Sequence, residues 1–378
     1  MSTLIDRHLK IPQYLQLAEH LREQIESGQL QPGDRLPSFN EMKAQFDAVQ
    51  RTVEKAHALL EGDGLIRREA GRGVFVNQPA TQTKTGNVGF VLPHNMQPER
   101  DMTYWGLALS GIRQAARDRN YHLLLIDEDD SFNRWDKMDG VVLCDTRDPR
   151  NLERAMPRPP VNFPAVSIFN KIPGTACITT DDADGFYQLT RHLIELGHTR
   201  IAYLATITKG IHQLEVRREG YLRALREAGI EPDPHWQCDI RKRPEWNGLM
   251  SWYPLAGEYY VNQWLETGWN ELGCTALIAQ NDAVAKGAMN AFQAAGIKVP
   301  EDISIAGFDG LPLYSDTLTL TTAKAPLFEM GLQAMNSLLD WLKDSSNAPQ
   351  DIQLPVELIQ GNTTAAPATQ KQEKLLPI

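Results

Sequence analysis

The sequence of 378 residues contains no apolar run that approaches the roughly 20 residues needed to cross a bilayer. Its first residues, MSTLIDRHLK, also lack the apolar stretch and small-residue cleavage site of a secretion signal. Both absences argue against a membrane protein and against a secreted one. We therefore expect a cytoplasmic protein with no membrane partner.

Cysteine is scarce, and the four cysteines form no C-x-x-C pair. Their scattered positions argue against a disulfide framework and against a zinc site, and favour reduced thiols in the core: Cys144, Cys177, Cys238 and Cys274. The sequence also lacks a P-loop, a G-x-S-x-G elbow and a G-x-G-x-x-G motif after a strand. We expect no cofactor and no metal.

Two groups of residues could suggest an enzyme. Asp181, Asp182 and Asp184 could serve acid–base chemistry or bind a metal, but their position favours helix capping. His192 and His198 do not form the H-E-x-x-H pattern of a metalloprotease, so we interpret them as structural or exposed. The sequence predicts a protein that is not an enzyme.

A strong excess of positive charge is absent as well. The formal net charge is -10, which argues against indiscriminate binding of nucleic acid. Even residues 1 to 78, taken alone, contain slightly more acidic than basic residues. If DNA is the partner, the placement of individual charges must determine binding.

Residues 12 to 78 have the pattern of three short helices closed by a hairpin. Pro12 opens the first helix, and Ser38 with Glu41 forms a capping box that starts the second. The stretch FDAVQRTVEKAHALL predicts the third helix, capped by Asp47. Its apolar face is expected to consist of Val49, Val53, Ala56 and Leu60.

The segment after these helices changes to short apolar runs with glycines between them. LI and VFV flank the turn EAGRG, which predicts two strands joined by a glycine-rich tip. Two helices joined by a tight turn and followed by such a hairpin indicate a winged helix-turn-helix. We assign it residues 1–78, and the polar stretch over residues 79–87 is predicted to be a linker.

The pattern beyond the linker is entirely different. The apolar runs VGFVL, HLLLI, GVVLC, AVSIF, RIAYLA, ALIAQ and ISIAGF are mostly separated by amphipathic helical stretches. This alternation predicts parallel sheets covered by helices, and the length predicts two lobes. The expected fold is α/β: an N-terminal winged helix-turn-helix and a two-lobed, doubly wound α/β domain over residues 88–362. Residues 363–378 are predicted to be disordered.

The N-terminal unit resembles the GntR-type winged-helix DNA-binding domain. The motifs that carry the resemblance are G-x-L-x-P-G-D-R-L-P-S, G-L-I and G-R-G-V-F-V, in that order. The resemblance implies a helix in the major groove and a wing close to the backbone or minor groove. It implies contacts with an operator in double-stranded DNA from Arg35, Ser38, Asn40, Gln50, Arg51, Thr52, Lys55, Gly71, Arg72 and Gly73.

The base-reading positions depart from that family, which usually places arginines there. This chain has Asn40, Gln50 and Glu54, with Arg51 one place after the usual arginine. Asparagine and glutamine pair with adenine, and glutamate accepts from cytosine N4, so the operator should differ from that of a typical relative. Glu54 could also face solvent, or pair with Lys55 or Arg51. An alternative interpretation is a head that no longer binds DNA and only mediates dimer contacts.

The remainder resembles the LacI/GalR effector-binding domain, which is like a periplasmic sugar-binding protein. The motifs are DDADGFYQLTRHLIELGHTRIAYL, RREGYLRAL, TALIAQNDAVAKGAMNAFQAAGIKVPEDISIAGFDG and LTTAKAPLFEMGLQAMNSLL. The resemblance implies an effector cleft lined by Arg217, Asn281 and Asp309, with Trp252 near a stacking position. Polar groups at the carboxyl ends of parallel strands suit a ligand with many hydroxyls.

Three features qualify the second resemblance. Only a short stretch lies between Asp130 and Met138, where that family has a full helix. The LacI-type head and hinge helix are absent, so the combination is similar to the arabinose-repressor type of GntR regulator. Five tryptophans could stack on a sugar, but core or subunit-interface roles are as consistent with their type: Trp236, Trp246, Trp252, Trp264 and Trp269.

The two resemblances together imply a transcription regulator of carbohydrate-utilisation genes. The expected partners are an operator, a second copy of the chain in a homodimer, and a mono- or disaccharide effector with or without a phosphate group. The alternative is a sugar-binding sensor or receptor protein without DNA-binding activity.

Overall fold

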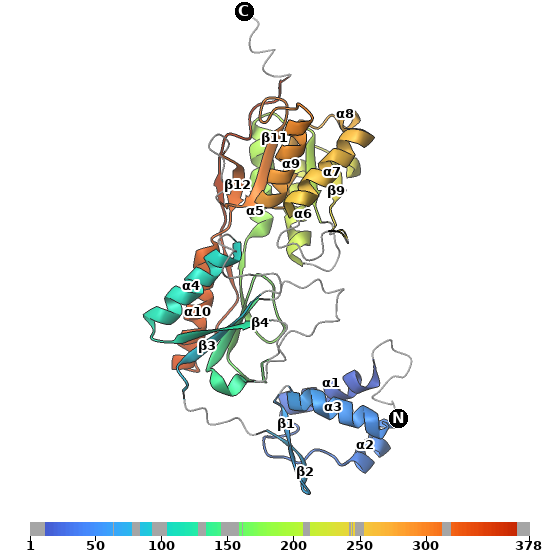
Figure 1. Ribbon diagram of the computed structural model, residues 1–378, viewed down its shortest axis with the longest axis vertical. Helices are drawn as coiled ribbons and strands as arrows, with labels where there is room; N and C mark the ends of the chain where they lie inside the picture. Colours follow the sequence, from blue (N-terminus) through green and yellow to red (C-terminus); the bar gives the residue numbers. More distant parts are fainter. Residues whose placement is uncertain are drawn as a thin grey trace, which may run out of the picture.

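The computed structural model describes residues 12–62, 64–77, 84–92, 104–127, 134–144, 159–160, 162–206, 212–241, 243, 245, 253–311 and 319–368. These residues form an N-terminal head and two α/β lobes (Figure 1). None of the helices in these ranges is long and apolar enough to cross a membrane.

The head contains three helices and a hairpin: α1 (Gln13–Glu26), α2 (Phe39–Phe46), α3 (Gln50–Gly62), β1 (Ile66–Glu69) and β2 (Gly73–Val76). The two strands pair antiparallel, as the sequence predicts. Leu17 and Leu21 of α1, Met42 of α2 and Leu60 of α3 are fully buried and form one core. The head therefore has a hydrophobic core of its own.

The start of α3 differs from the sequence prediction. The capping box of Ser38 and Glu41 is present at α2. Asp47 ends α2 in the left-handed conformation, at a φ of 50°. Val49 accepts the first helical hydrogen bond, from Val53 N at 3.2 Å, and its side chain is 62% exposed. The prediction that Val49 joins the buried face is therefore wrong, whereas Val53 is buried.

The N-lobe is built on a six-stranded sheet in the order β13-β7-β6-β5-β3-β4. Its strands are all parallel: β3 (Asn87–Leu92), β4 (His122–Asp127), β5 (Gly140–Cys144), β6 (Ala165–Ile168), β7 (Ala176–Thr180) and β13 (Ile352–Leu354). Helices α4 (Tyr104–Asp118) and α10 (Leu327–Lys343) lie side by side against this sheet (Figure 1). In this order β4 is an edge strand.

The C-lobe has a second sheet of the same size, in the order β14-β12-β11-β10-β8-β9. Only β14 runs antiparallel to its neighbour. The strands are β8 (Ile201–Ala205), β9 (Gln237–Asp239), β10 (Ala276–Ala279), β11 (Ser304–Asp309), β12 (Thr321–Lys324) and β14 (Glu357–Ile359). The helices of this lobe are α5 (Asp182–Glu195), α6 (His212–Glu227), α7 (Tyr253–Thr267), α8 (Trp269–Leu272) and α9 (Asp282–Ala294).

The chain passes between the lobes three times. The passages lie between β7 and α5, between β12 and α10, and between β13 and β14. Each lobe is therefore completed by segments far apart in the sequence, and both predicted lobes are confirmed. A domain pair joined by short segments of this kind can open and close about them.

The stretch between Asp130 and Met138 is too short for the full helix of the LacI/GalR family, so a shortened or lost helix is expected there, and the part of this connection that the structure describes agrees. Residues 134 to 139 contain only a 3₁₀ turn, Trp135–Lys137, and residues 128–133 lie outside the described residues. Trp135 fills the space by packing edge-to-face on Phe163, with 5.4 Å between ring centroids. A small apolar cluster thus covers this face of the N-lobe sheet.

The start of the predicted disordered tail is wrong. Thr363 is fully buried; its hydroxyl donates to Ile305 O at 2.7 Å and accepts from Thr321 N at 2.9 Å. Two residues on, Ala365 O accepts from Ser304 Oγ at 3.0 Å. Small polar residues bond here to the first residues of the inner strands β11 and β12, a role that composition alone does not distinguish from disorder. Residues 369–378 lie outside the described residues.

Candidate DNA-binding surface and effector site

The first turn of α3 exposes a row of polar side chains. Gln50, Arg51 and Lys55 are exposed, and Thr52 is half-buried. All of these except Gln50 also border a hollow of about 230 Å³, which is lined by Gln13, Tyr14, Val49, Arg51, Thr52 and Lys55. Asn40 and the capping Ser38 are exposed at the start of α2. These side chains are therefore accessible to a partner.

The partners of Glu54 answer a question that the sequence leaves open. Among the described residues Glu54 bonds to Gln50, whose Nε2 donates to Glu54 Oε1 at 2.8 Å, rather than to Arg51 or Lys55. Lys55 instead places its ammonium group 5.1 Å from the centroid of the Tyr14 ring. The acidic side chain is thus held within the polar row of α3.

The wing owes its shape to two glycines. Gly71, at the exposed tip, has a φ of 73°, and Gly73 has a φ of 122°. A Cβ at Gly73 would lie 2.8 Å from Arg35 Nε, so the glycine lets the Arg35 side chain lie against the hairpin. Arg72 Nη1 donates to Glu69 Oε2 at 2.5 Å, which holds its guanidinium beside the wing.

A buried arginine forms the centre of the candidate effector site. Arg217 Nε donates to Asp182 Oδ2 at 2.7 Å, and Nη1 donates to Gln280 O at 3.1 Å. The guanidinium lies 4.4 Å from the centroid of the Phe308 ring. Burial opposes its charge, but the Asp182 carboxylate, with the nearby Tyr104 and Asp309, raises the pKa of Arg217. The arginine is therefore a fixed cation.

Asp309 ends β11 close to this arginine. It is 6% exposed and has a φ of 119°, a conformation that non-glycine residues rarely adopt. Burial, together with the carboxylates of Asp282 and Asp182, raises the pKa of Asp309 well above its usual range, against the opposing effect of Arg217. Backbone strain and a perturbed carboxyl group often occur together at functional sites.

Asn281 and its neighbour connect these groups. Asn281 Oδ1 caps α9 by accepting from Val284 N at 2.9 Å, next to the carbonyl that binds Arg217. Asp282 is fully buried and accepts from Thr322 Oγ1 at 2.6 Å and from Leu311 N at 2.7 Å. The structure thus gathers the predicted Arg217, Asn281 and Asp309 at the carboxyl ends of the C-lobe strands.

Aromatic side chains of the N-lobe meet this polar cluster. The rings of Tyr104, at the start of α4, and Phe169, after β6, stack with 5.2 Å between their centroids. Trp105 packs edge-on against Phe169 at 4.7 Å. Burial raises the pKa of Tyr104, and so does the nearby carboxylate of Asp309. The candidate site therefore involves both lobes.

The sequence predicted a different aromatic group. Trp236 and Trp269 are buried in the C-lobe core, and Trp264 packs 5.6 Å from Trp269, so these three have the core role that was left open. Trp246 and Trp252 lie outside the described residues. The group of Asp181, Asp182 and Asp184 was expected to cap a helix, and Asp181 does so by accepting from Asp184 N at 3.0 Å, whereas Asp182 binds Arg217. No local pattern marks Tyr104 or Phe169, because they meet the site only in the folded chain.

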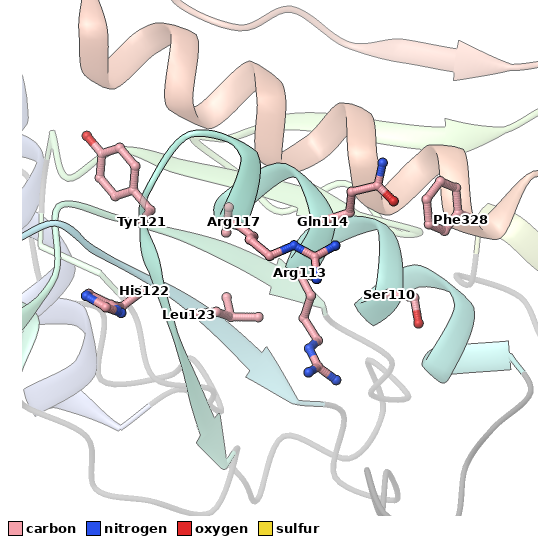
Figure 2. A pocket seen from close by; sticks show the side chains of 9 residues that line it. Ser110, Arg113, Gln114, Arg117, Tyr121, His122, Leu123 and Phe328 are labelled. Carbon is pink, nitrogen blue, oxygen red and sulfur yellow. The ribbon is translucent and has the colours of Figure 1, made fainter.

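A second hollow lies on the outer side of the N-lobe, between α4, the start of β4 and the first turn of α10 (Figure 2). Its volume is about 450 Å³, and it is lined by Ser110, Arg113, Gln114, Ala116, Arg117, Tyr121, His122, Leu123 and Phe328. Arg113 and Arg117 are exposed, and Phe328 is 37% exposed. This surface is separate from the effector site.

Comparison with known proteins assigns both parts of the chain. Residues 13–76 match the family described as bacterial regulatory proteins, gntR family, and residues 190–364 match the periplasmic binding protein-like domain. The arabinose metabolism transcriptional repressor of Geobacillus stearothermophilus is 27% identical over 94% of this chain and 98% of its own length. The HTH-type transcriptional regulator GalR of Escherichia coli is 36% identical over 50% of this chain and 52% of its own length.

Solved structures share the fold of the two lobes. A LacI family transcriptional regulator from Enterococcus faecium with bound ribose superposes with a TM-score of 0.60 at 23% identity, covering 74% of this chain and 99% of its own. The transcriptional regulator CelR in complex with cellobiose gives 0.62 at 20% identity, covering 85% and 93%. All four of these proteins are named as transcriptional regulators or repressors. The chain joins a head that matches the gntR family to a periplasmic-binding-protein-like domain with the two-lobed fold of LacI family regulators.

Proposed function

We propose that this protein is a sequence-specific repressor of carbohydrate-utilisation genes whose operator affinity is set by a sugar bound between the lobes. The observation that carries the proposal is the union, in one chain, of a head with exposed polar side chains on α3 and a two-lobed domain centred on the Arg217–Asp182 pair. A relative that spans almost the whole chain is named as an arabinose metabolism repressor, which supports the same function. Such a protein acts in the cytoplasm, where its operator is.

The proposed DNA contacts divide by chemistry. Gln50 and Asn40 read base edges in the major groove, since amide side chains pair with adenine. The other side chains contact phosphates through their charges or hydroxyl groups. These contacts position the protein on the duplex without reading the base sequence. They are Arg35, Ser38, Arg51, Thr52, Lys55 and Arg72. Gly71 and Gly73 let the wing approach the duplex closely because they lack a side chain.

The proposed effector is a sugar of one or two rings, with or without a phosphate group. Arg217, Asn281 and Asp309 offer donors and acceptors for several hydroxyls, and the aromatic cluster of the N-lobe supplies an apolar surface for the ring. Arabinose, ribose and cellobiose appear in the names of relatives and similar structures, and so they head the panel to be tested. Trp252 remains a candidate for stacking on the ligand.

The active form that we propose is a homodimer formed through the N-lobes. Phe328 is exposed at the hollow of Figure 2, and Leu123 of the edge strand β4 lines it. Leu125, on the same side of the strand as Leu123, is 47% exposed. A second copy on this surface would cover apolar area and present two heads to a two-fold symmetric operator.

The test is binding of fluorescent DNA from the gene's own promoter region, measured by anisotropy with and without each sugar. We expect nanomolar binding to a site with two-fold symmetry, and a shift of about 5- to 150-fold on addition of the effector. Sugar binding without any DNA binding would identify the alternative, a sensor or receptor protein. Equal operator affinity with and without a bound sugar would refute the regulatory link.

A further inference from the structure

The hydrogen bond between Gln50 and Glu54 constrains what the head can read. Both side chains are exposed on the first turns of α3, and Gln50 Nε2 donates to Glu54 Oε1 at 2.8 Å. A carboxylate close to DNA lowers affinity by repelling phosphates. Glu54 therefore cannot be on this helix to increase the overall affinity for DNA, and another role is needed to explain it.

The chemistry of the amide supplies that role. A glutamine side chain can turn by half a rotation, which exchanges its carbonyl oxygen and its NH₂ group. A carboxylate accepts hydrogen bonds and donates none, so Glu54 requires the NH₂ group of Gln50 on its side. The opposite rotation would bring two acceptors together and lose the bond. Gln50 is thus left with Oε1 as an acceptor, and with one further N–H as a donor, for an external partner.

This arrangement distinguishes the two purines. In the major groove adenine offers the N6 amino group as a donor and N7 as an acceptor, whereas guanine offers two acceptors, O6 and N7. One acceptor and one donor on Gln50 match adenine, while guanine O6 would face Oε1. We infer that Glu54 is a specificity-determining residue that orients Gln50 to read adenine and to reject guanine. The inference rests on the proposed DNA-binding function and specifies which base the head selects.

Selection from a pool of random duplexes, with competition binding at one salt concentration, tests the inference. We expect the full-length protein to select adenine at one position of each half-site and to prefer it over guanine by about 10-fold or more. Glu54→Gln keeps the shape but can accept or donate, so both rotations of Gln50 become available. The preference should then fall to within about threefold. Removing the negative charge should raise the affinity for every duplex. This gain cancels in the ratio of the affinities for the adenine and guanine duplexes.

Glu61→Gln is the matched control. It makes the same change of charge on the same helix, but Glu61 Oε2 accepts from Arg68 Nε at 2.9 Å and has no bond to Gln50 among the described residues. This variant should keep the wild-type preference, with helix content checked by circular dichroism for both. A preference that survives Glu54→Gln, or falls equally in Glu61→Gln, overturns the inference but leaves the proposed function standing. A wild-type protein that selects no sequence overturns the proposed function itself.

Discussion

At the scale of single residues, the resemblance-based predictions named residues on one side of the candidate effector site and none on the other. Asn281 and Asp309 stand at the ends of recognisable strands, and Arg217 lies in the helix that follows β8, so all three were expected near the carboxyl ends of the C-lobe strands, where the structure places them. Asp182 and Phe169 belong to segments whose proximity depends on how the lobes pack. The partners of buried charges are set by tertiary structure, which a local motif does not encode.

Replacing Arg217 by Ala should abolish the response to sugar. The change leaves Asp182, 2% exposed, without its cationic partner, and breaking a buried pair in this way costs about 3–5 kcal/mol. The head has its own core, so operator binding should persist. Calorimetric unfolding and operator binding with the sugar panel check both parts. The neighbouring Arg218→Ala, which removes a bond to Gln237, is the control; loss of DNA binding in Arg217→Ala alone would contradict the assigned role.

The carboxyl group of Asp282 should make the stability of the effector domain depend on pH. Burial raises its pKa from 3.8 to about 7. The folded state therefore favours the protonated group, and this contribution to stability is complete below about pH 4 and lost as the pH rises through 7. In Asp282→Asn the group no longer titrates, so melting temperature measured from pH 4 to 8 should fall less steeply than in the wild type. Parallel curves for the two proteins would show that Asp282 is not the source.

At the scale of elements, most helices and strands follow from apolar periodicity and capping signals. The exceptions are residues whose burial depends on surrounding structure that the local pattern does not show. Val49 has the right spacing for the buried face of α3, but it precedes the helix and is exposed. Thr363 has a disorder-like composition around it, yet its hydroxyl donates a hydrogen bond to Ile305 O at the start of the inner strand β11. Apolar periodicity predicts which face of a helix is buried. It predicts neither the residue at which the helix begins, which decides the exposure of Val49, nor the long-range hydrogen bonds that bury Thr363.

The crossing of α4 and α10 leads to a prediction about packing. A Cβ at Gly111 would lie 2.0 Å from Phe328 O, and one at Gly331 would lie 2.0 Å from Ala108 O, so the two backbones touch through their glycines. Gly111→Ala should force the helices apart and destabilise the N-lobe by about 1–3 kcal/mol. Thermal unfolding measures the effect. Gly62→Ala, in α3 with nothing within 4 Å of its Cβ position, should be neutral or slightly stabilising; an equal loss in both variants would refute the packing argument.

At the scale of the whole molecule, the sequence predicted the order of parts better than the connection between them. The composition of the linker indicates a flexible chain, but the structure shows how its far end is attached. Asp139 is 4% exposed, and its carboxylate accepts from Thr85 N at 2.7 Å, from Thr85 Oγ1 at 2.9 Å and from Gly86 N at 3.0 Å. The point at which the linker enters β3 is therefore fixed to the N-lobe. We expect a movement of the N-lobe to reach the head through this attachment.

Asp139→Asn should weaken the link between sugar and operator while leaving each binding event in place. The amide keeps the size of the side chain but replaces one acceptor oxygen by a donor, so at least one of the bonds to Thr85 or Gly86 is lost. The end of the linker then moves more freely, and less of the lobe movement is transmitted to the heads. Operator affinity measured with and without the bound sugar gives the coupling factor, which we expect to fall about fivefold or more towards one. Asp136→Asn, which removes an exposed carboxylate beside Lys137, should leave the factor unchanged. The sugar, the operator and the lobes are the same in both proteins. If Asp139→Asn keeps the coupling factor of the wild type, the signal must therefore reach the heads by a route other than the anchored linker.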